Sequence, residues 1–435
     1  MGRSLAAAAQ TRAARLRYSY LFLPGLMSLA FTALAGLLVW ADLAAGAEGV
    51  VDVFPAGASA ARTVLSVIAG SLITVAGVAF SITIVSLQLV SQQFTPRALR
   101  TFLGDRLNQA VAGFFIGIFL YCLVVLTAVK EGDDTTVPGL SMLVALVLAA
   151  VALGMLLVFI DHMAHAIQVS EIASRVAHQT LQAAAAPYPS SYGTPLDEDP
   201  ADVRARWEAE REPLLVFPER PGFVETVDDI PGTIGGRGFR IALLVKPGDF
   251  VTENHPLAAV WPSAGADGCE QALRRAVAVA AERDLSQDIA YGIRQLTDIA
   301  VRALSPSVND PTTATTCIGY IQAILERLAS TELPPQVRVF PDQDVTLLLP
   351  RHGVESYLES LLQISRYAAD ARVADALLRA TLRVAEAGRR GGHDEWARAA
   401  AAVARRIHDR ATERGVLDRP EQEALDRLLE QTFAV

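Results

Sequence analysis

The sequence has few residues of the kinds that build metal, redox or covalent active sites. Its three cysteines, Cys122, Cys269 and Cys317, lie far apart and form no Cys-x-x-Cys pair. Neither a disulfide framework nor a zinc site is therefore expected. The sequence also has no Ser-His-Asp order, no metal triad and no nucleotide-binding loop. We therefore expect no cofactor, no bound metal and no enzymatic activity.

The sequence also has fewer positively than negatively charged residues. The chain has 435 residues, with 38 Lys and Arg against 47 Asp and Glu, and its formal net charge is −9. Nucleic-acid-binding proteins usually carry a basic patch or stripe, and none stands out in this sequence. A nucleic-acid partner is therefore not expected.

Charge is absent from four long apolar stretches in the first 165 residues, namely residues 21–40, 64–90, 110–129 and 137–160. Each is at least about 20 residues long, which is enough to cross a hydrocarbon core about 30 Å thick. None contains an acidic, basic or histidine residue, and this disfavours a proton relay or a transporter of charged substrates. The pattern predicts an integral membrane protein in a lipid bilayer.

The charges that flank these stretches alternate in sign. The N-terminal segment is basic, with Arg3, Arg12, Arg15 and Arg17. The loop after the first stretch is acidic, with Asp42, Glu48 and Asp52, and the loop after the second is basic, with Arg97, Arg100 and Arg106 against Asp105. The loop after the third stretch is acidic again, with Glu131, Asp133 and Asp134 against Lys130. Basic loops prefer the cytoplasmic side of a membrane. Both termini are therefore predicted to be cytoplasmic.

The second stretch carries a line of small and polar residues. No charge or proline lies between Arg62 and Gln93, and a helix of that length would measure about 46–48 Å. It should outrun the membrane and stop near Pro96. Residues spaced by three, four or seven share one helix face, and those on this face are Ser71, Thr74, Gly77, Ser81, Gln88 and Gln92. Two interpretations stay open: a helix–helix seam, or a pore lining in an oligomer with Gln88 and Gln92 at its cytoplasmic mouth.

The fourth apolar stretch is expected to continue as a helix to about residue 184. It passes through His162 and His165, which share a face next to Asp161 and Glu171. A metal or pH-sensing site is conceivable there. With no third close ligand evident, a helix turn at the membrane interface is favoured.

Beyond a proline-rich linker at 185–213, the pattern predicts strands at 221–227, 239–245, 250–251, 256–261, 338–341 and 345–349. Lys246-Pro-Gly-Asp249 predicts a turn. The run Pro247-Gly-Asp-Phe-Val-x4-Pro256-Leu-Ala-x-Val resembles the hammerhead of lipoyl- and biotinyl-type domains and related barrel-sandwich hybrids. No counterpart of their swinging-arm lysine is present, so the resemblance implies a fold and not a cofactor.

Residues 288–304 predict an amphipathic helix that ends near Pro306. A second helix follows to about residue 328, with Asp310 as N-cap and Pro311 in its first position. The polar residues of this segment are Asp298, Arg302, Ser305, Asn309, Asp310, Thr312 and Thr313. One interpretation is architectural, with an Asp298–Arg302 pair and caps locking a tight turn. The other is a small-ligand or ion site at a helix N-terminus.

The C-terminal part predicts amphipathic helices at 354–369, 373–386, 395–413 and 421–433, with a break at Gly391-Gly392. A bundle or a subunit contact is the expected arrangement.

The motif Asp298-Ile-Ala-x-Arg-Ala-Leu-Ser-Pro-x-x-Asn-Asp-Pro-x-Thr-Ala314 resembles the DUF2254 family of predicted bacterial membrane proteins. Leu87-Gln-Leu-Val-Ser-Gln-Gln-Phe-Thr-Pro-Arg97, Asn108-Gln109 and the hammerhead-like run also fit that family. The resemblance covers residues 15–380 and implies a bacterial cytoplasmic (inner) membrane. It brings no established activity.

Together these patterns predict an α-helical integral membrane protein with four transmembrane helices and a C-terminal α+β cytoplasmic region. That region should contain a small barrel-sandwich-like β subdomain and a helical bundle. The expected segments are a basic N-terminus (1–18), the transmembrane domain (19–165), a helical extension and linker (166–213), the β subdomain (214–265), a helical segment with the Asn-Asp-Pro turn and short strands (266–350), and the bundle (351–435). We expect a homo-oligomeric channel or pore for a small ion or ligand, regulated by its cytoplasmic domain. The alternative is a membrane-anchored ligand sensor or scaffold.

Overall fold

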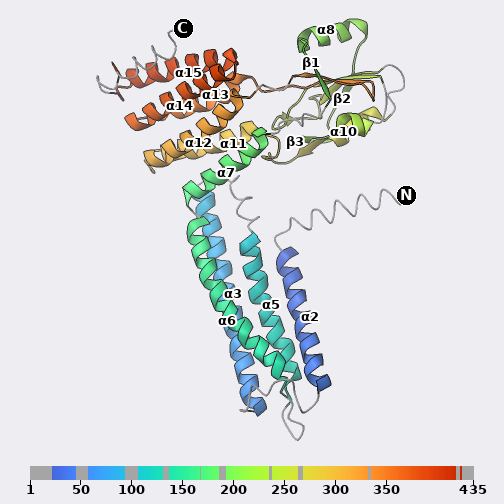
Figure 1. Ribbon diagram of the computed structural model, residues 1–435, viewed down its shortest axis with the longest axis vertical. Helices are drawn as coiled ribbons and strands as arrows, with labels where there is room; N and C mark the ends of the chain where they lie inside the picture. Colours follow the sequence, from blue (N-terminus) through green and yellow to red (C-terminus); the bar gives the residue numbers. More distant parts are fainter. Residues whose placement is uncertain are drawn as a thin grey trace. The chain divides into compact units, whose positions relative to one another are not determined.

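The structure is a computed structural model that describes residues 22–45, 57–93, 106–130, 137–166, 168–185, 193–234, 238–262, 268–331, 335–417 and 422–423. The chain divides into two compact units, residues 1–171 and 172–435. We refer to them as the four-helix unit and the α+β unit. Figure 1 follows their helices and strands along the chain.

The four-helix unit consists, in its described residues, of helices α2 (Phe22–Ala45), α3 (Gly57–Gln93), α5 (Arg106–Ala128) and α6 (Gly139–Ala166). All four are long and apolar enough to cross a membrane, which confirms the four predicted stretches to within a few residues at most ends. Helix α3 begins earlier than expected and has 37 residues, so it is about 56 Å long. The predicted stop at Pro96 lies outside the described residues.

Helix α5 is the centre of this unit. Half of its apolar window is buried (50%), against 11% in α2, 22% in α3 and 17% in α6. It contacts all three other helices, and two of its glycines lie close to α2. A Cβ on Gly113 would lie 2.7 Å from Pro24 Cα, and one on Gly117 would lie 2.5 Å from the Phe31 ring. Small residues four apart thus let the two backbones approach, as in many membrane helix pairs.

A polar cluster joins the end of α2 to the start of α6. The Asp42 carboxylate accepts hydrogen bonds from Leu140 N at 3.1 Å, Ser141 N at 2.9 Å and Ser141 Oγ at 2.7 Å. Tyr121 on α5 donates its hydroxyl to Ser141 O at 2.9 Å. Asp42 therefore caps α6 from another helix and satisfies amides that would otherwise have no partner.

The expectation that the fourth helix continues to residue 184 is wrong. Helix α6 ends at Ala166, and a separate helix, α7 (Val169–Ala185), follows it. Gln168 N bonds to His165 O at 3.0 Å, an i to i−3 bond that tightens the turn and interrupts the α-helical pattern. The break has a physical reason, because α7 joins the core of the α+β unit through Val176, Ala177 and Thr180.

The α+β unit contains two sheets. The larger has the strand order β1-β8-β9-β4-β6-β2 and is antiparallel except for the parallel pair β4–β9; the smaller is antiparallel with the order β5-β3-β7. The strands are β1 (Thr194–Leu196), β2 (Leu214–Val216), β3 (Gly222–Val227), β4 (Phe239–Leu243), β5 (Phe250–Val251), β6 (Ala258–Pro262), β7 (Val277–Ala280), β8 (Val337–Phe340) and β9 (Val345–Leu348). All six predicted strands are confirmed, and β1, β2 and β7 were not predicted.

The larger sheet draws its strands from residues 194 to 348, so the segment predicted as a β subdomain, 214–265, does not build it alone. The segment predicted as a linker contains β1 and the helix α8 (Pro200–Glu210), which Asp199 caps through Ala201 N. Helices α9 (Ile230–Ile234) and α10 (Cys269–Ala276) are further additions. A barrel-sandwich-like fold stays a prediction.

The two faces of the larger sheet bury different side chains. One face shares a core with the smaller sheet and α10, through residues such as Ile241, Val260 and Leu273. The other face packs against Val203 and Trp207 of α8. Trp207 and Trp261 meet with ring centroids 5.3 Å apart. Strand alternation explains the division, because neighbouring residues of a strand point to opposite faces.

The remaining helices are α11 (Ile289–Ala303), α12 (Pro311–Ala329), α13 (Val354–Ser365), α14 (Ala371–Arg390) and α15 (Asp394–Glu413). They confirm the predicted helices, and Gly391 ends α14 as expected. The predicted helix at 421–433 lies almost wholly outside the described residues. Helix α7 packs so closely on α11 that a Cβ on Gly292 would lie 1.8 Å from Thr180 Oγ1.

Candidate functional site

The polar face predicted on the second helix points away from the rest of the four-helix unit. Ser71, Thr74, Gly77, Ser81 and Gln88 are all exposed, whereas the Gln92 side chain lies outside the described residues. The buried residues of α3 are on the opposite side and are Ala58, Ala61, Leu65, Ile68, Ala69, Leu72, Ala79 and Ser86. Helix α3 therefore packs against the other described helices of its own chain through the opposite face and not through the polar face.

This face runs further than the sequence pattern suggested. Thr63, Ser66 and Gly70 precede Thr74 at spacings of three and four and are also exposed. Ser71 lies at the margin of the same face. We call the residues Thr63, Ser66, Gly70, Thr74, Gly77, Ser81 and Gln88 the α3 stripe. Among the described residues, a Cβ on Gly70 or Gly77 would meet no atom within 4 Å.

Three hydroxyls of the α3 stripe bond within their own helix. Thr63, Thr74 and Ser81 each donate to the carbonyl four residues earlier at 2.9 Å. Their donors are thus satisfied, while each oxygen keeps capacity to accept a hydrogen bond. Large apolar side chains flank the stripe, including Val78 and Val85, which are 51% and 52% exposed. The face therefore combines an apolar border with a narrow, uncharged, hydroxyl-bearing centre.

The residues of the Asn-Asp-Pro turn are held mainly by each other. Asn309 has φ 48°, and its backbone N bonds to Ser305 O at 2.9 Å. Asp310 caps α12, accepting from Thr313 N at 3.1 Å and Thr313 Oγ1 at 2.6 Å. These hydrogen bonds lower the pKa of Asp310 below its usual value. The contacts agree with the architectural interpretation, and a ligand at this turn stays a prediction.

The other polar residues of that segment lie around the turn. Asp298 forms an ion pair with Arg294, at 3.0 Å, one turn before it. Arg302 is exposed on the following turn of α11. Ser305 Oγ lies 3.3 Å from Ser307 Oγ, and Thr312 O accepts from the hydroxyls of two later threonines of α12. The predicted Asp298–Arg302 pair stays a prediction.

His162 and His165 both lie near the end of α6. His165 Nδ1 lies 2.8 Å from Asp161 O and 3.7 Å from Asp161 Oδ1, all on α6. Within the described part of the chain, no group of three or more His, Cys, Asp or Glu side chains has the geometry of a metal site.

A buried ion pair that sequence reasoning missed lies at the start of α11. Arg283 donates from Nε and Nη2 to Asp288 Oδ2 at 2.8 and 2.6 Å, and Asp288 Oδ1 caps α11 by accepting from Tyr291 N at 2.9 Å. The Asp288 side chain is only 1% exposed. Burial raises its pKa, and the neighbouring Arg283 opposes that shift.

The predicted turn at Lys246–Asp249 packs directly onto this pair. Gly248 has φ 93°, and a Cβ there would lie 2.1 Å from Asp288 Oδ2, so only glycine fits. Lys246 Nζ lies 3.1 Å from Asp249 Oδ1. Burial, together with the charges of Lys246 and Arg283, lowers the pKa of His352 to about 4. The turn, the start of α11 and the segment after β9 thus meet in one charged cluster.

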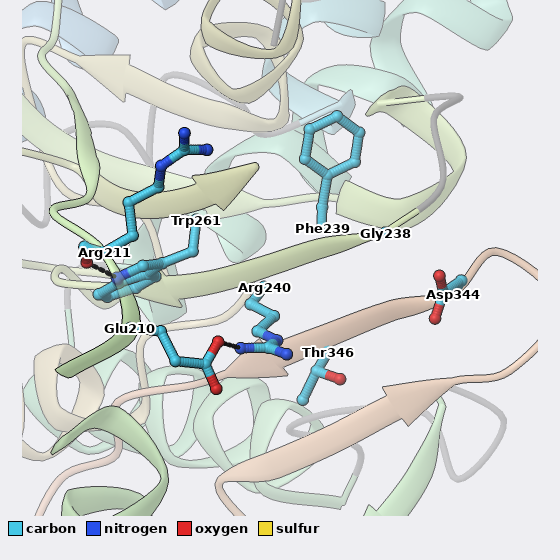
Figure 2. Close-up of a pocket in the computed structure, with 8 residues that line it drawn as sticks. All are labelled: Glu210, Arg211, Gly238, Phe239, Arg240, Trp261, Asp344 and Thr346. Atoms are coloured by element: carbon cyan, nitrogen blue, oxygen red, sulfur yellow. Dashed lines mark hydrogen bonds and ion pairs between the residues drawn. The ribbon is translucent and has the colours of Figure 1, made fainter. Parts of the chain in front are cut away.

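A cavity of about 440 Å³ opens over the α8 face of the larger sheet. Trp261, Arg240 and Thr346 are side by side on β6, β4 and β9 and line it with Glu210 and Asp344. Figure 2 shows Arg240 and Glu210 pointing toward one another, as an ion pair, while Phe239 points away from them. Trp261 Nε1 donates to Arg211 O at 3.0 Å. Two arginines and two carboxylates balance the charge of this lining.

Four apolar helices, each long enough to cross a membrane, followed by a separate α+β unit are the architecture expected of a multi-span membrane protein. The family model described as "Predicted membrane protein (DUF2254)" matches residues 17–383, and the chain belongs to this family. It is 36% identical over 321 residues to the uncharacterized protein Rv1290c of Mycobacterium tuberculosis and, to the same extent, to the uncharacterized protein Mb1321c of Mycobacterium bovis. The match covers 71% of this chain but only 60% of each relative. No solved structure matches the chain.

Proposed function

We propose that the protein is a homo-oligomeric channel in which the α3 stripe of each copy lines a path for a small ion or polar solute. The observation that carries this proposal is the direction of the stripe, which faces away from the described helices of its own chain. Small residues allow helices of neighbouring copies to approach closely. Hydroxyl oxygens with unused acceptor capacity suit a wetted, uncharged path better than hydrocarbon.

The experiment that tests the channel is ion flux through purified protein in liposomes. Ser81→Leu and Gln88→Leu place large apolar groups on the α3 stripe and should reduce flux several-fold. Val158→Leu is the matched control, because Val158 is exposed on α6, away from the face that carries the α3 stripe, and the change keeps an apolar side chain. Its flux should equal that of the parent protein.

Two outcomes would overturn the channel. One is the absence of flux in the parent protein under varied voltage, tension, pH and calcium. The other is a monomer in mild detergent with equal behaviour of all three variants.

We also propose a bacterial inner-membrane location with both termini in the cytoplasm. The support is the alternation of charge along the sequence, in which the loop with Arg97, Arg100 and Arg106 comes between two acidic loops. Of these arginines only Arg106, at the start of α5, is among the described residues, and the N-terminal arginines lie outside them. A reporter active only outside the cytoplasm should be inactive when fused to the C-terminus and active when inserted in the loop at 131–136. The reverse pattern would contradict this topology.

The second candidate function is a membrane-anchored sensor without transport. The cavity of Figure 2 favours it, because its volume of about 440 Å³ is within the range of small-molecule sites. In that case flux would be absent and the α3 variants would behave as the parent protein.

A further inference from the structure

A second cavity in the α+β unit differs from the first in its charge. It measures about 360 Å³ and is formed by the loop between β2 and β3, helix α10 and strand β7. Three arginines, Arg220, Arg274 and Arg275, line it with a single carboxylate, that of Glu219. Leu257, Val277 and Val279 supply an apolar floor. A lining with this surplus of cations stands out in a chain whose net charge is −9.

Helix α10 positions two of the arginines. Its Leu273 and Ala276 are buried in the core below the cavity, so the neighbouring Arg274 and Arg275 point outward. Arg274 is fixed by protein groups: Nε donates to Phe217 O at 2.8 Å, and its other nitrogens face Glu270 and Glu219. Its charge is therefore largely used within the protein.

The other two guanidinium groups keep donors for a ligand. Arg220 uses one nitrogen, Nη2, to donate to Val279 O at 2.9 Å, and this bond holds the side chain against the cavity. Arg275 is exposed, and within the described part of the chain it has no hydrogen-bond or ion-pair partner. A guanidinium carries five N–H donors in a planar fork that matches phosphate and carboxylate groups.

We propose that this cavity binds an organic phosphate, with the phosphate group on Arg220 and Arg275 and the organic part over Leu257, Val277 and Val279. A phosphate monoester carries a charge of about −1.5 to −2 near neutral pH, which balances the two guanidinium groups. An apolar floor next to cations favours an organic ester over a bare inorganic ion. The site shares no residue with the α3 stripe, and this proposal does not rest on the channel.

The test is a binding titration of the purified full-length protein by calorimetry. One arm uses adenosine 5′-monophosphate as a free phosphate monoester, and the other uses nanodiscs with and without phosphatidic acid as a lipid source of the same group. We expect saturable binding in at least one arm. Arg220→Ala and Arg275→Ala should each weaken this binding about tenfold. Arg275→Lys should retain part of the affinity, because it keeps the charge and loses the fork.

Arg406→Ala is the matched control, because Arg406 is exposed on α15 and lies outside the cavity. Its affinity should equal that of the parent protein. No saturable binding in either arm would overturn the proposal. Binding that Arg406→Ala weakens as much as Arg275→Ala would also overturn it, because it would report the overall charge only. Ion flux is measured independently of these titrations, so the phosphate site and the channel succeed or fail separately.

Discussion

The two units of this protein place the same kind of side chain in opposite positions. In the four-helix unit, large apolar residues face outward: Leu29 is 70% exposed, and Leu153 and Leu157 are each 64% exposed. In the α+β unit, leucines such as Leu296 and Leu358 are fully buried. Burial of apolar area therefore stabilises the α+β unit, as in a protein surrounded by water. The four-helix unit must depend more on close helix contacts and polar caps, as helices in lipid do.

The largest expected effect concerns the buried ion pair of the α+β unit. Arg283→Met leaves Asp288 buried without its cationic partner and should destabilise this unit by about 3–5 kcal/mol. The measurement is urea denaturation followed by tryptophan fluorescence, since Trp207, Trp261 and Trp396 all belong to this unit.

Arg294→Met is the control for that prediction. It removes an ion pair whose arginine side chain is 49% exposed, and a loss of no more than about 1 kcal/mol is expected. Equal losses in the two variants would show that the buried position of Asp288 has no special effect.

The next effect concerns helix contact in the four-helix unit. Gly113→Ala forces a Cβ to within 2.7 Å of Pro24 Cα, a backbone atom that cannot rotate away, and should cost about 1–3 kcal/mol. Gly154→Ala on α6 is the control, because a Cβ there meets no described atom within 4 Å. It should be neutral or stabilising, since alanine favours helices over glycine. The thermal stability of both variants in detergent is measured by size-exclusion chromatography. Similar shifts in thermal stability for the two variants would contradict the close contact at Gly113.

The smallest effect is a dependence of stability on pH. Because the pKa of His352 falls from 6.5 to about 4 on folding, the unfolded chain binds more protons between these values. Stability should therefore fall as pH decreases, by at most about 2 kcal/mol from pH 7.5 to pH 5. The raised pKa of Asp288 has the opposite effect on the pH dependence of stability. The variant His352→Gln therefore separates the contribution of the histidine from that of Asp288. Urea denaturation at the two pH values should show a smaller loss of stability in the variant than in the parent protein. An equal loss in both proteins would exclude His352 as the cause.

Local signals predicted much of this fold. Asp310 and Pro311 marked the start of α12, and Gly391 marked the end of α14, because caps depend on only a few neighbouring residues. Strand pairing was not predicted. Strand β4 pairs in parallel with β9 more than 100 residues later in the chain, and alternation within a strand does not specify its partner.

The candidate sites also divide into one that the local sequence predicted and one that it did not. Four residues of the α3 stripe, namely Thr74, Gly77, Ser81 and Gln88, were found from their spacing, yet that spacing fits a seam and a pore lining equally. The cavity with Arg220, Arg274 and Arg275 has no sequence signal, because its arginines come from a loop and a helix about 50 residues apart.

By itself the sequence determined four apolar spans, a following α+β region and membership in a family, because length, hydropathy and motif spacing are properties of contiguous residues. Only the tertiary structure decided which face of α3 the unit buries, that Gly248 packs on the Arg283–Asp288 pair, and that three arginines surround one cavity. These features depend on which distant residues meet, and packing rather than local pattern determines such meetings.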